Sequence, residues 1–274
     1  MNHIQQAGED GRSAGYGYED IILNAINCNL NGEIAQKVIN TISQNENLDI
    51  STFHICAEKM PSKVIDRFQN TKKTSPKADI RINFRNNEEN YSFGISIKSS
   101  NISIQVQITN IDNFKRACIS QSLDFSEDLY VGLSKFCGFG QYKPTDEEKI
   151  NLIQGERDRW LIPELNQNEQ IAIQNFFTEN QEFVTKLVLK EGTALEEFFA
   201  DYYLVNNTKY SQTQEVDFCI KPMSEVIQKS LNKGGYTVTE KGSFHIGSVT
   251  VQMKGSGGRS TEAYHGFQFN KSGC

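Results

Sequence analysis

An aspartate and a lysine stand at the ends of two stretches in which apolar residues alternate. Pro76-Lys77-Ala78-Asp79 opens the first stretch and Ser96-Ile97-Lys98 closes the second, with sixteen residues between Asp79 and Ser96. A carboxylate is a natural ligand of Mg²⁺, which can polarise a phosphoryl oxygen and lower the pKa of a bound water. A lysine beside it can orient that water and offset charge that develops in the transition state. The pair therefore suggests metal-assisted hydrolysis of a phosphodiester.

The elements expected around this pair place both side chains on one face of a sheet. Apolar residues alternate strictly in three successive stretches, residues 79–84, 93–98 and 102–108. Such a period of two predicts strands. If the first two strands pair, Asp79, Ser96 and Lys98 project from the face opposite the apolar residues. We expect Asp79 and the backbone carbonyl of Ile97 to bind the metal, and Lys98 to act in catalysis.

The remaining pattern indicates an α/β chain. Helical spacing predicts helices over residues 17–28, 34–42, 168–190 and 194–205. A short helix is expected after Met223, followed by short strands over residues 236–238, 244–246 and 249–251. We expect a mixed β-sheet flanked by helices, with a small β region near the C-terminus. Residues 1–145 would form the catalytic region and residues 146–274 a recognition region. The two regions can pack together as one domain.

Charge is unevenly distributed along the chain. The net charge is −6, which argues mildly against a nucleic-acid partner. However, residues 59–85 hold eight lysines and arginines against two acidic residues, and residues 241–271 hold four against one. Residues 144–201 between them hold five basic and thirteen acidic residues. Two basic segments could therefore line a positive cleft, although charge runs are more often simply solvated faces.

The first residues, the apolar stretches and the cysteines of the chain are consistent with an intracellular protein. The first residues carry neither a basic nor an apolar signal region, and no stretch approaches the length of a membrane span. We therefore expect a cytoplasmic protein that is not bound to a membrane. None of the six cysteines forms a CxxC pair, and we expect reduced thiols in place of a zinc site.

The catalytic segment resembles the PD-(D/E)xK nuclease signature, with one departure. That signature has an acidic residue where this chain has Ser96. A serine is a poor Mg²⁺ ligand, so Ser96 could hold a metal-bound water, or a second carboxylate could come from elsewhere. Glu19, on the first expected helix, is the candidate that we favour for this second carboxylate.

At greater length the chain resembles the MspI and HinP-type group of type II restriction endonucleases. The resemblance rests on ordered segments, residues 17–23, 75–79, 95–100, 168–177, 196–198, 241–255 and 267–269. In these enzymes a glutamate lies on the N-terminal helix, and the position of Ser96 holds an amide residue. The resemblance implies a mixed α/β fold, Mg²⁺ as cofactor and double-stranded DNA as substrate. It further implies a cognate DNA methyltransferase as functional partner, a monomer or weak homodimer, and a four-base site containing CG, such as GCGC or CCGG.

The C-terminal region is expected to read the DNA. Glycines allow a backbone to approach a base pair, and basic or amide side chains can bond base edges in the major groove. The candidates there are Gln252, Lys254, Ser256, Arg259, His265, Gln268 and Lys271. Ser99, Ser100 and Asn101 are candidates of second rank. Lys72, Lys73 and Lys77 are expected to contact phosphates.

Three alternatives remain open from the sequence. The chain could be a repair or structure-specific nuclease of the same fold. It could be a DNA-binding relative without catalysis, which Ser96 makes conceivable. It could also be a binding module with no nucleic-acid partner. Discrete Mg²⁺-dependent fragments of a plasmid would separate a restriction enzyme from all three.

Overall fold

A computed structural model describes residues 17–98, 104–153, 157–206, 217–240, 242–253 and 266–271. The chain divides into two compact units. The first comprises residues 1–104, 189–228 and 272–274, and the second comprises residues 105–188 and 229–271. The chain thus leaves the first unit, builds most of the second and returns. The expected division at residue 145 stays a prediction about which stretches act in catalysis and which in recognition.

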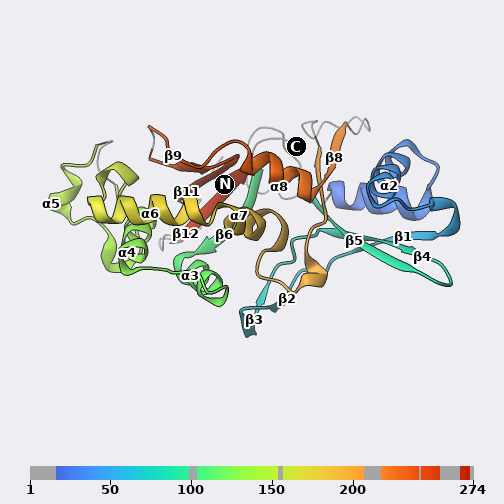
Figure 1. Cartoon of the computed structure of the whole chain (residues 1–274), viewed down its shortest axis with the longest axis horizontal. Coiled ribbons are helices and arrows are strands. Elements are labelled where there is room, and N and C mark those ends of the chain that lie inside the picture. Colours follow the sequence, from blue (N-terminus) through green and yellow to red (C-terminus); the bar gives the residue numbers. More distant parts are fainter. Residues whose placement is uncertain are drawn as a thin grey trace, which may run out of the picture. The chain divides into compact units, whose positions relative to one another are not determined.

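The first unit contains a mixed five-stranded sheet with the strand order β1-β4-β5-β7-β8. Its strands are β1 (His54–Lys59), β4 (Ile80–Arg85), β5 (Asn90–Lys98), β7 (Tyr202–Asn206) and β8 (Phe218–Pro222). β5 and β7 are parallel, and the other neighbours are antiparallel. β1, β4 and β5 run side by side in Figure 1. A separate hairpin joins β2 (Val64–Asp66) to β3 (Gln69–Thr74).

The alternation in the sequence sets the two faces of this sheet. Ile80, Ile82, Phe84 and Ile95 are fully buried, and Ile97 is nearly so. They pack in one core with a helix over residues 17–28 and with α2 (Glu33–Glu46), which contribute an apolar stripe at helical spacing. The expected pairing of the first two strands is confirmed, since β4 and β5 are antiparallel neighbours.

One expected helix is wrong. Residues 194–205 contain only a short 3-10 turn, Glu196–Phe198, before β7 begins at Tyr202. β7 lies between β5 and β8 and is buried along its whole length. A strand buried on both faces has no alternation, and a short apolar run of this kind cannot be told from a buried helix by periodicity.

The second unit contains another five-stranded sheet, with the order β6-β12-β11-β10-β9. Its strands are β6 (Ile104–Asn110), β9 (Tyr236–Val238), β10 (Phe244–Ile246), β11 (Val249–Met253) and β12 (Gly266–Lys271). The expected strand at 102–108 is therefore present as β6, but it joins this sheet and not the sheet of β4 and β5. Alternation shows that a strand is half buried but does not show which strand it pairs with.

Helices cover the apolar side of this second sheet. They are α3 (Ile111–Ser120), α4 (Glu127–Cys137), α5 (Asp146–Lys149), α6 (Gln167–Glu179) and α7 (Gln181–Lys186), followed by a π-helical turn, Leu187–Glu191. A cluster of buried aromatic rings joins them to the strands. Phe114 of α3 contacts Phe177 of α6 and Phe267 of β12, at 6.0 and 5.6 Å between ring centroids. α8 (Met223–Leu231) follows β8 in the chain and leads towards β9.

Two further expectations concern cysteines and membranes. Cys28, Cys56, Cys118 and Cys137 are free thiols, as expected. Among the described residues, no helix combines the length and the apolar character that crossing a membrane requires.

Candidate active site

Asp79 lies immediately before β4, at a corner of the first sheet where three strands meet. Its backbone N–H donates to the carbonyl of Ile95 on β5 at 2.8 Å. Its carbonyl accepts a hydrogen bond from the N–H of Met60, just past the end of β1, at 3.1 Å. The backbone of Asp79 is therefore held on both sides, which fixes where its carboxylate can point.

Three donors from β5 converge on one carboxylate oxygen. Oδ2 of Asp79 accepts from the backbone N–H of Ile97 at 2.5 Å, from Nζ of Lys98 at 3.2 Å and from Oγ of Ser96 at 3.4 Å. The structure thus brings together the side chains that the sequence placed on one face. Ser96 is only 2% exposed, and its hydroxyl contacts the aspartate. This geometry suits a residue that positions Asp79.

Glu19 brings a second carboxylate to the same corner. It lies on the helix over residues 17–28, whose buried face anchors it to the sheet. Glu19 and Asp79 both line a cavity of about 210 Å³, together with Lys59, Met60, Ser62 and Ser75. Burial raises the pKa of Glu19; the hydrogen bond from Lys59 opposes this, and the nearby charge of Asp79 adds to it. The two carboxylates are therefore close enough to repel each other.

The donor set fits a hard divalent cation. In the described part of the chain, no hydrogen bond is seen at Oδ1 of Asp79, and that atom and Glu19 supply the carboxylate oxygens that Mg²⁺ prefers. The N–H and C=O of a strand residue point to the same side, so the carbonyl of Ile97 faces the side of Asp79, where β4 has not yet begun. No cluster of three or more His, Cys, Asp or Glu occurs among the described residues, so a cation here would rely on two carboxylates and a carbonyl.

The three lysines expected to contact phosphates differ in exposure. Lys72 and Lys73 are exposed on β3. Lys77 is only 7% exposed, and its aliphatic stem packs near Gly192. Burial lowers the pKa of Lys77 well below its usual value; the charge of Lys98 lowers it further and Asp79 opposes the shift. Lys72 and Lys73 are thus accessible to a phosphate, whereas Lys77 is buried.

The second sheet has one apolar and one polar face. Gln252 of β11 and Gln268 of β12 are directly opposite each other. In the next row, Thr250 faces His245 across the strands, and its hydroxyl is 2.9 Å from Nδ1 of His245. These side chains are partly exposed and can donate and accept hydrogen bonds, as groups that read base edges do. The patterns of β10 and β11 alone do not single out His245 and Thr250, because only the register of the two strands brings these side chains together.

The other residues predicted to contact DNA are either buried or outside the described residues. Lys271, at the end of β12, is 3% exposed, which disfavours a direct contact in this conformation. The remaining candidates lie outside the described residues: Ser99, Ser100, Asn101, Lys254, Ser256, Arg259 and His265. Lys59 lines the cavity beside Asp79 and Glu19, and the sequence does not single it out. Only the pairing of β1 with β4 brings it there, and no local pattern indicates that pairing.

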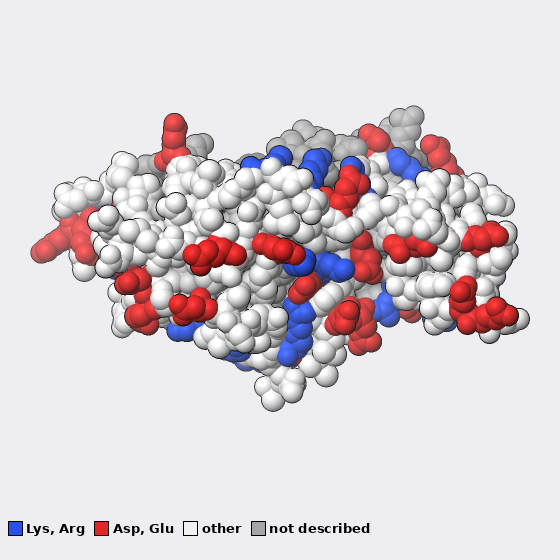
Figure 2. Space-filling view, in the orientation of Figure 1, with Lys and Arg blue, Asp and Glu red and all other residues white. Residues whose placement is uncertain are grey.

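The surface charges follow the sequence segments. In Figure 2, acidic side chains lie scattered over α5 and α6, as the acidic stretch at residues 144–201 predicts. Basic side chains are visible on the same view over the β2–β3 hairpin. The hairpin that carries Lys72 and Lys73 is thus the more favourable of these surfaces for a polyanion.

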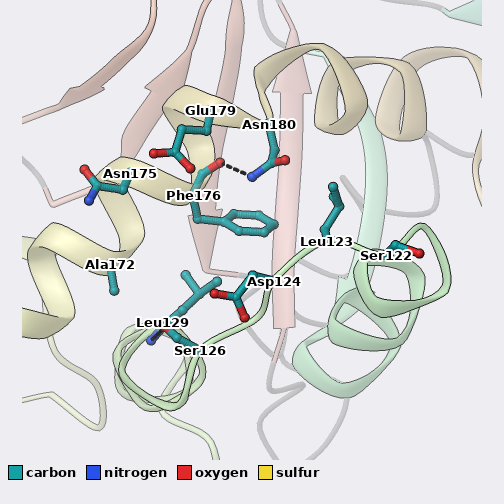
Figure 3. A pocket seen from close by; sticks show the side chains of 10 residues that line it. All are labelled: Ser122, Leu123, Asp124, Ser126, Leu129, Ala172, Asn175, Phe176, Glu179 and Asn180. Carbon is teal, nitrogen blue, oxygen red and sulfur yellow. Dashed lines mark hydrogen bonds between the residues drawn. The ribbon is translucent and has the colours of Figure 1, made fainter.

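A second cavity, of about 370 Å³, lies between helices of the second unit. Figure 3 shows the ring of Phe176 at its centre, with the carboxylates of Asp124 and Glu179 around it. Both carboxylates are exposed, and Asn180 uses its side-chain amide to donate to the carbonyl of Phe176. This cavity holds no lysine and no buried carboxylate, so it lacks the chemistry of the corner at Asp79.

Comparison with known proteins identifies the family. No curated protein sequence matches the chain. Among solved structures, restriction endonuclease MspI in complex with its cognate DNA is similar, with a TM-score of 0.61 and 12% identity over 98% of this chain and 93% of that one. At this identity the likeness establishes the fold. The family model of the R.HinP1I restriction endonuclease matches residues 75–272, which include Asp79, Lys98 and the whole second unit. The chain belongs to the R.HinP1I restriction endonuclease family and is a type II site-specific deoxyribonuclease.

Proposed function

We propose that this enzyme cuts double-stranded DNA at a short palindromic site, with Mg²⁺ bound at the corner formed by Asp79, Glu19 and the carbonyl of Ile97. The observation that carries the proposal is the convergence of Lys98, Ser96 and the Ile97 N–H on one oxygen of Asp79. MspI is similar in fold and was solved with its cognate DNA, which supports duplex DNA as the substrate.

Each residue has a distinct part in this proposal. Mg²⁺, when bound, would polarise the scissile phosphate and lower the pKa of a water. Lys98 would orient the attacking water and offset the charge that develops on the phosphate. Ser96 and the Ile97 N–H would hold Asp79, so that its other oxygen faces the cation. Glu19 would supply the second carboxylate that Ser96 does not provide.

Recognition would use the polar face of the second sheet. Gln252 and Gln268 would bond base edges, and Lys254, Ser256, Arg259 and His265 would follow from the segment between β11 and β12. Lys72 and Lys73 would contact phosphates. Ser99, Ser100 and Asn101, directly after Lys98, would contribute near the cut. A CG-containing four-base site such as GCGC or CCGG and a partner methyltransferase remain part of this proposal.

Digestion of a DNA of known sequence tests the proposal. The parent should give discrete fragments with Mg²⁺ and none with EDTA, and the mapped ends should share one short sequence. Asp79→Asn should cut at least about a thousandfold more slowly, because the cation loses its main ligand. Asp201→Asn is the matched control, since Asp201 also accepts a backbone N–H of β5, from Gly94, but does not line the cavity.

Three outcomes would contradict the proposal. A smear, or cutting only at junctions or lesions, would favour a structure-specific or repair nuclease. Duplex binding without any metal-dependent cutting would favour a relative without catalysis. If Asp79→Asn cuts as fast as Asp201→Asn, the active site lies elsewhere.

A further inference from the structure

The catalytic corner holds a second lysine that the proposed chemistry does not use. Nζ of Lys59 lies 3.1 Å from Oε2 of Glu19 and 3.3 Å from Oδ1 of Asp20. Lys59 ends β1 opposite Ile80, the residue after Asp79, so this ammonium and the catalytic carboxylate line the same cavity. Positive and negative groups therefore alternate at this corner: Lys98 forms an ion pair with Asp79, and Lys59 forms one with Glu19.

The two ion pairs differ in what a cation would have to displace. Asp79 keeps its Oδ2 contacts with β5 while Oδ1 faces away from them. Glu19 is only 14% exposed, and a cation that approaches its carboxylate meets the positive charge of Lys59. Like charges at this range in a partly buried site repel strongly. Lys59 thus competes with a cation for Glu19.

The exposure of Lys59 shows how its ammonium group could leave Glu19 and make room for a cation. Its side chain is 43% exposed, far more than that of Glu19, so its ammonium group can turn towards solvent or another partner while a cation takes its place at Glu19. The phosphate to be cut must lie beside the cation, hence within reach of the cavity that Lys59 lines. A phosphate oxygen is a strong acceptor for an ammonium group.

We propose that Lys59 holds the cation position at Glu19 in the DNA-free enzyme and moves to a DNA phosphate in the complex, so that DNA binding opens the metal site. This inference rests on the proposed function. Lys59 is then a positioning residue that couples the two ligands. Because coupling between two binding equilibria is reciprocal, bound metal also raises the affinity for DNA.

Metal binding to the free protein tests the first half of the proposal. Mn²⁺, followed by the electron paramagnetic resonance of the unbound ion, should bind Lys59→Met at least about tenfold more tightly than the parent, because the competing charge is gone. Lys59→Arg should bind it as the parent does. Lys63→Met is the matched control, since Lys63 contacts the hydroxyl of Ser75 and, among the described residues, pairs with no carboxylate; it should change the Mn²⁺ affinity less than about twofold.

The sign of the effect separates this role from a structural one. If Lys59 only fastens the first helix to β1, Lys59→Met would loosen Glu19 and weaken Mn²⁺ binding. Equal or weaker Mn²⁺ binding by Lys59→Met therefore overturns the proposal. Thermal unfolding of both methionine variants checks that they are folded.

DNA binding in EDTA tests the second half. Lys59→Met should bind duplex DNA with a salt dependence whose slope is smaller by about one than that of the parent, as the loss of one phosphate contact requires. An unchanged slope would mean that Lys59 does not move to a phosphate.

A double variant distinguishes this inference from the proposed function. If Asp79→Asn abolishes Mn²⁺ binding in the Lys59→Met background, the metal site is the proposed one, and the Lys59→Met result bears on the coupling alone. If the double variant binds Mn²⁺ as tightly as Lys59→Met, the metal lies elsewhere and the proposed function fails with it.

Discussion

The two five-stranded sheets present polar groups in contrasting ways. At the corner of the first sheet, charged groups converge on one point, where Oδ2 of Asp79 meets Lys98 and Glu19 pairs with Lys59. On the second sheet, uncharged groups are spread in register over several strands, with Gln252 opposite Gln268. Hydrolysis needs concentrated charge at one phosphorus, whereas reading bases needs a pattern of neutral donors and acceptors. The contrast predicts that substitutions in the first sheet change rate, and those in the second change specificity.

The largest effect within this comparison is expected at Lys98. Lys98→Met should lower the single-turnover cleavage rate by about a hundredfold or more, because the charge beside the scissile phosphate is lost. Lys98→Arg should recover part of that rate, since it keeps the charge but not the shape of the ammonium group. Specificity should be unchanged. A Lys98→Met enzyme that cuts at the parental rate would break the assignment of chemistry to the first sheet.

The glutamines of the second sheet should act on specificity. Gln252→Ala and Gln268→Ala should each lower the ratio of cognate to single-mismatch cleavage by about tenfold to a hundredfold, as the loss of one base contact predicts. Cleavage rates on matched and mismatched duplexes give this ratio. Gln174→Ala, at an exposed position of α6, is the matched control and should leave it unchanged. Equal effects of all three changes would argue that the polar face does not read bases.

The lysines of β3 should affect binding in a way that is independent of sequence. Lys72→Ala and Lys73→Ala should each reduce the slope of binding against salt by about one and weaken cognate and random duplexes equally. Lys77→Met should leave that slope unchanged and lower the cleavage rate, because Lys77 is buried and close enough to Asp79 for their charges to interact. A fall in slope for Lys77→Met would show that its ammonium group reaches the DNA.

The smallest effect concerns stability and a carboxylate outside the cavity. Burial raises the pKa of Asp201, while the Gly94 N–H and Lys190 oppose the shift. Between the usual and the raised pKa, the folded chain binds this proton more tightly than the unfolded chain, so the contribution of Asp201 to stability falls as pH rises through that interval. Asparagine carries no charge and still accepts from Gly94. Asp201→Asn should therefore be at least as stable as the parent at neutral pH, with the difference shrinking towards about pH 4 in urea unfolding.

A result of the opposite sign would be informative. If Asp201→Asn is less stable than the parent at neutral pH, the ion pair with Lys190, at 3.7 Å, contributes more than the burial of the charge costs.

The sequence was informative where a short pattern carries the geometry. Alternation in β4 and β5 was enough to place Asp79, Ser96 and Lys98 on one face. Glu19 was favoured by resemblance and does line the cavity. Lys59 could not be predicted, because only the long-range pairing of β1 with β4 brings it there.

The misassigned elements have related causes. β7 lies where the sequence predicts a helix, because a strand buried on both faces lacks alternation. β6 is a strand, as predicted, but alternation could not show that it belongs to the second sheet, because it does not specify the partner strand. His245 and Thr250 became visible as neighbours only through the register of β10 and β11. In each case, the outcome depends on how strands that are distant in the sequence pair, which a local pattern does not contain.

The most direct test of the central claim is to locate the cation. Crystals of the complex with uncleaved duplex DNA, soaked in Mn²⁺, would show the ion by anomalous scattering. The account predicts a peak about 2.1 Å from a carboxylate oxygen of Asp79, with Glu19 and the carbonyl of Ile97 in the same coordination sphere and Lys98 beside the scissile phosphate. A peak at other residues, with Asp79 still bound only to Lys98 and β5, would contradict it.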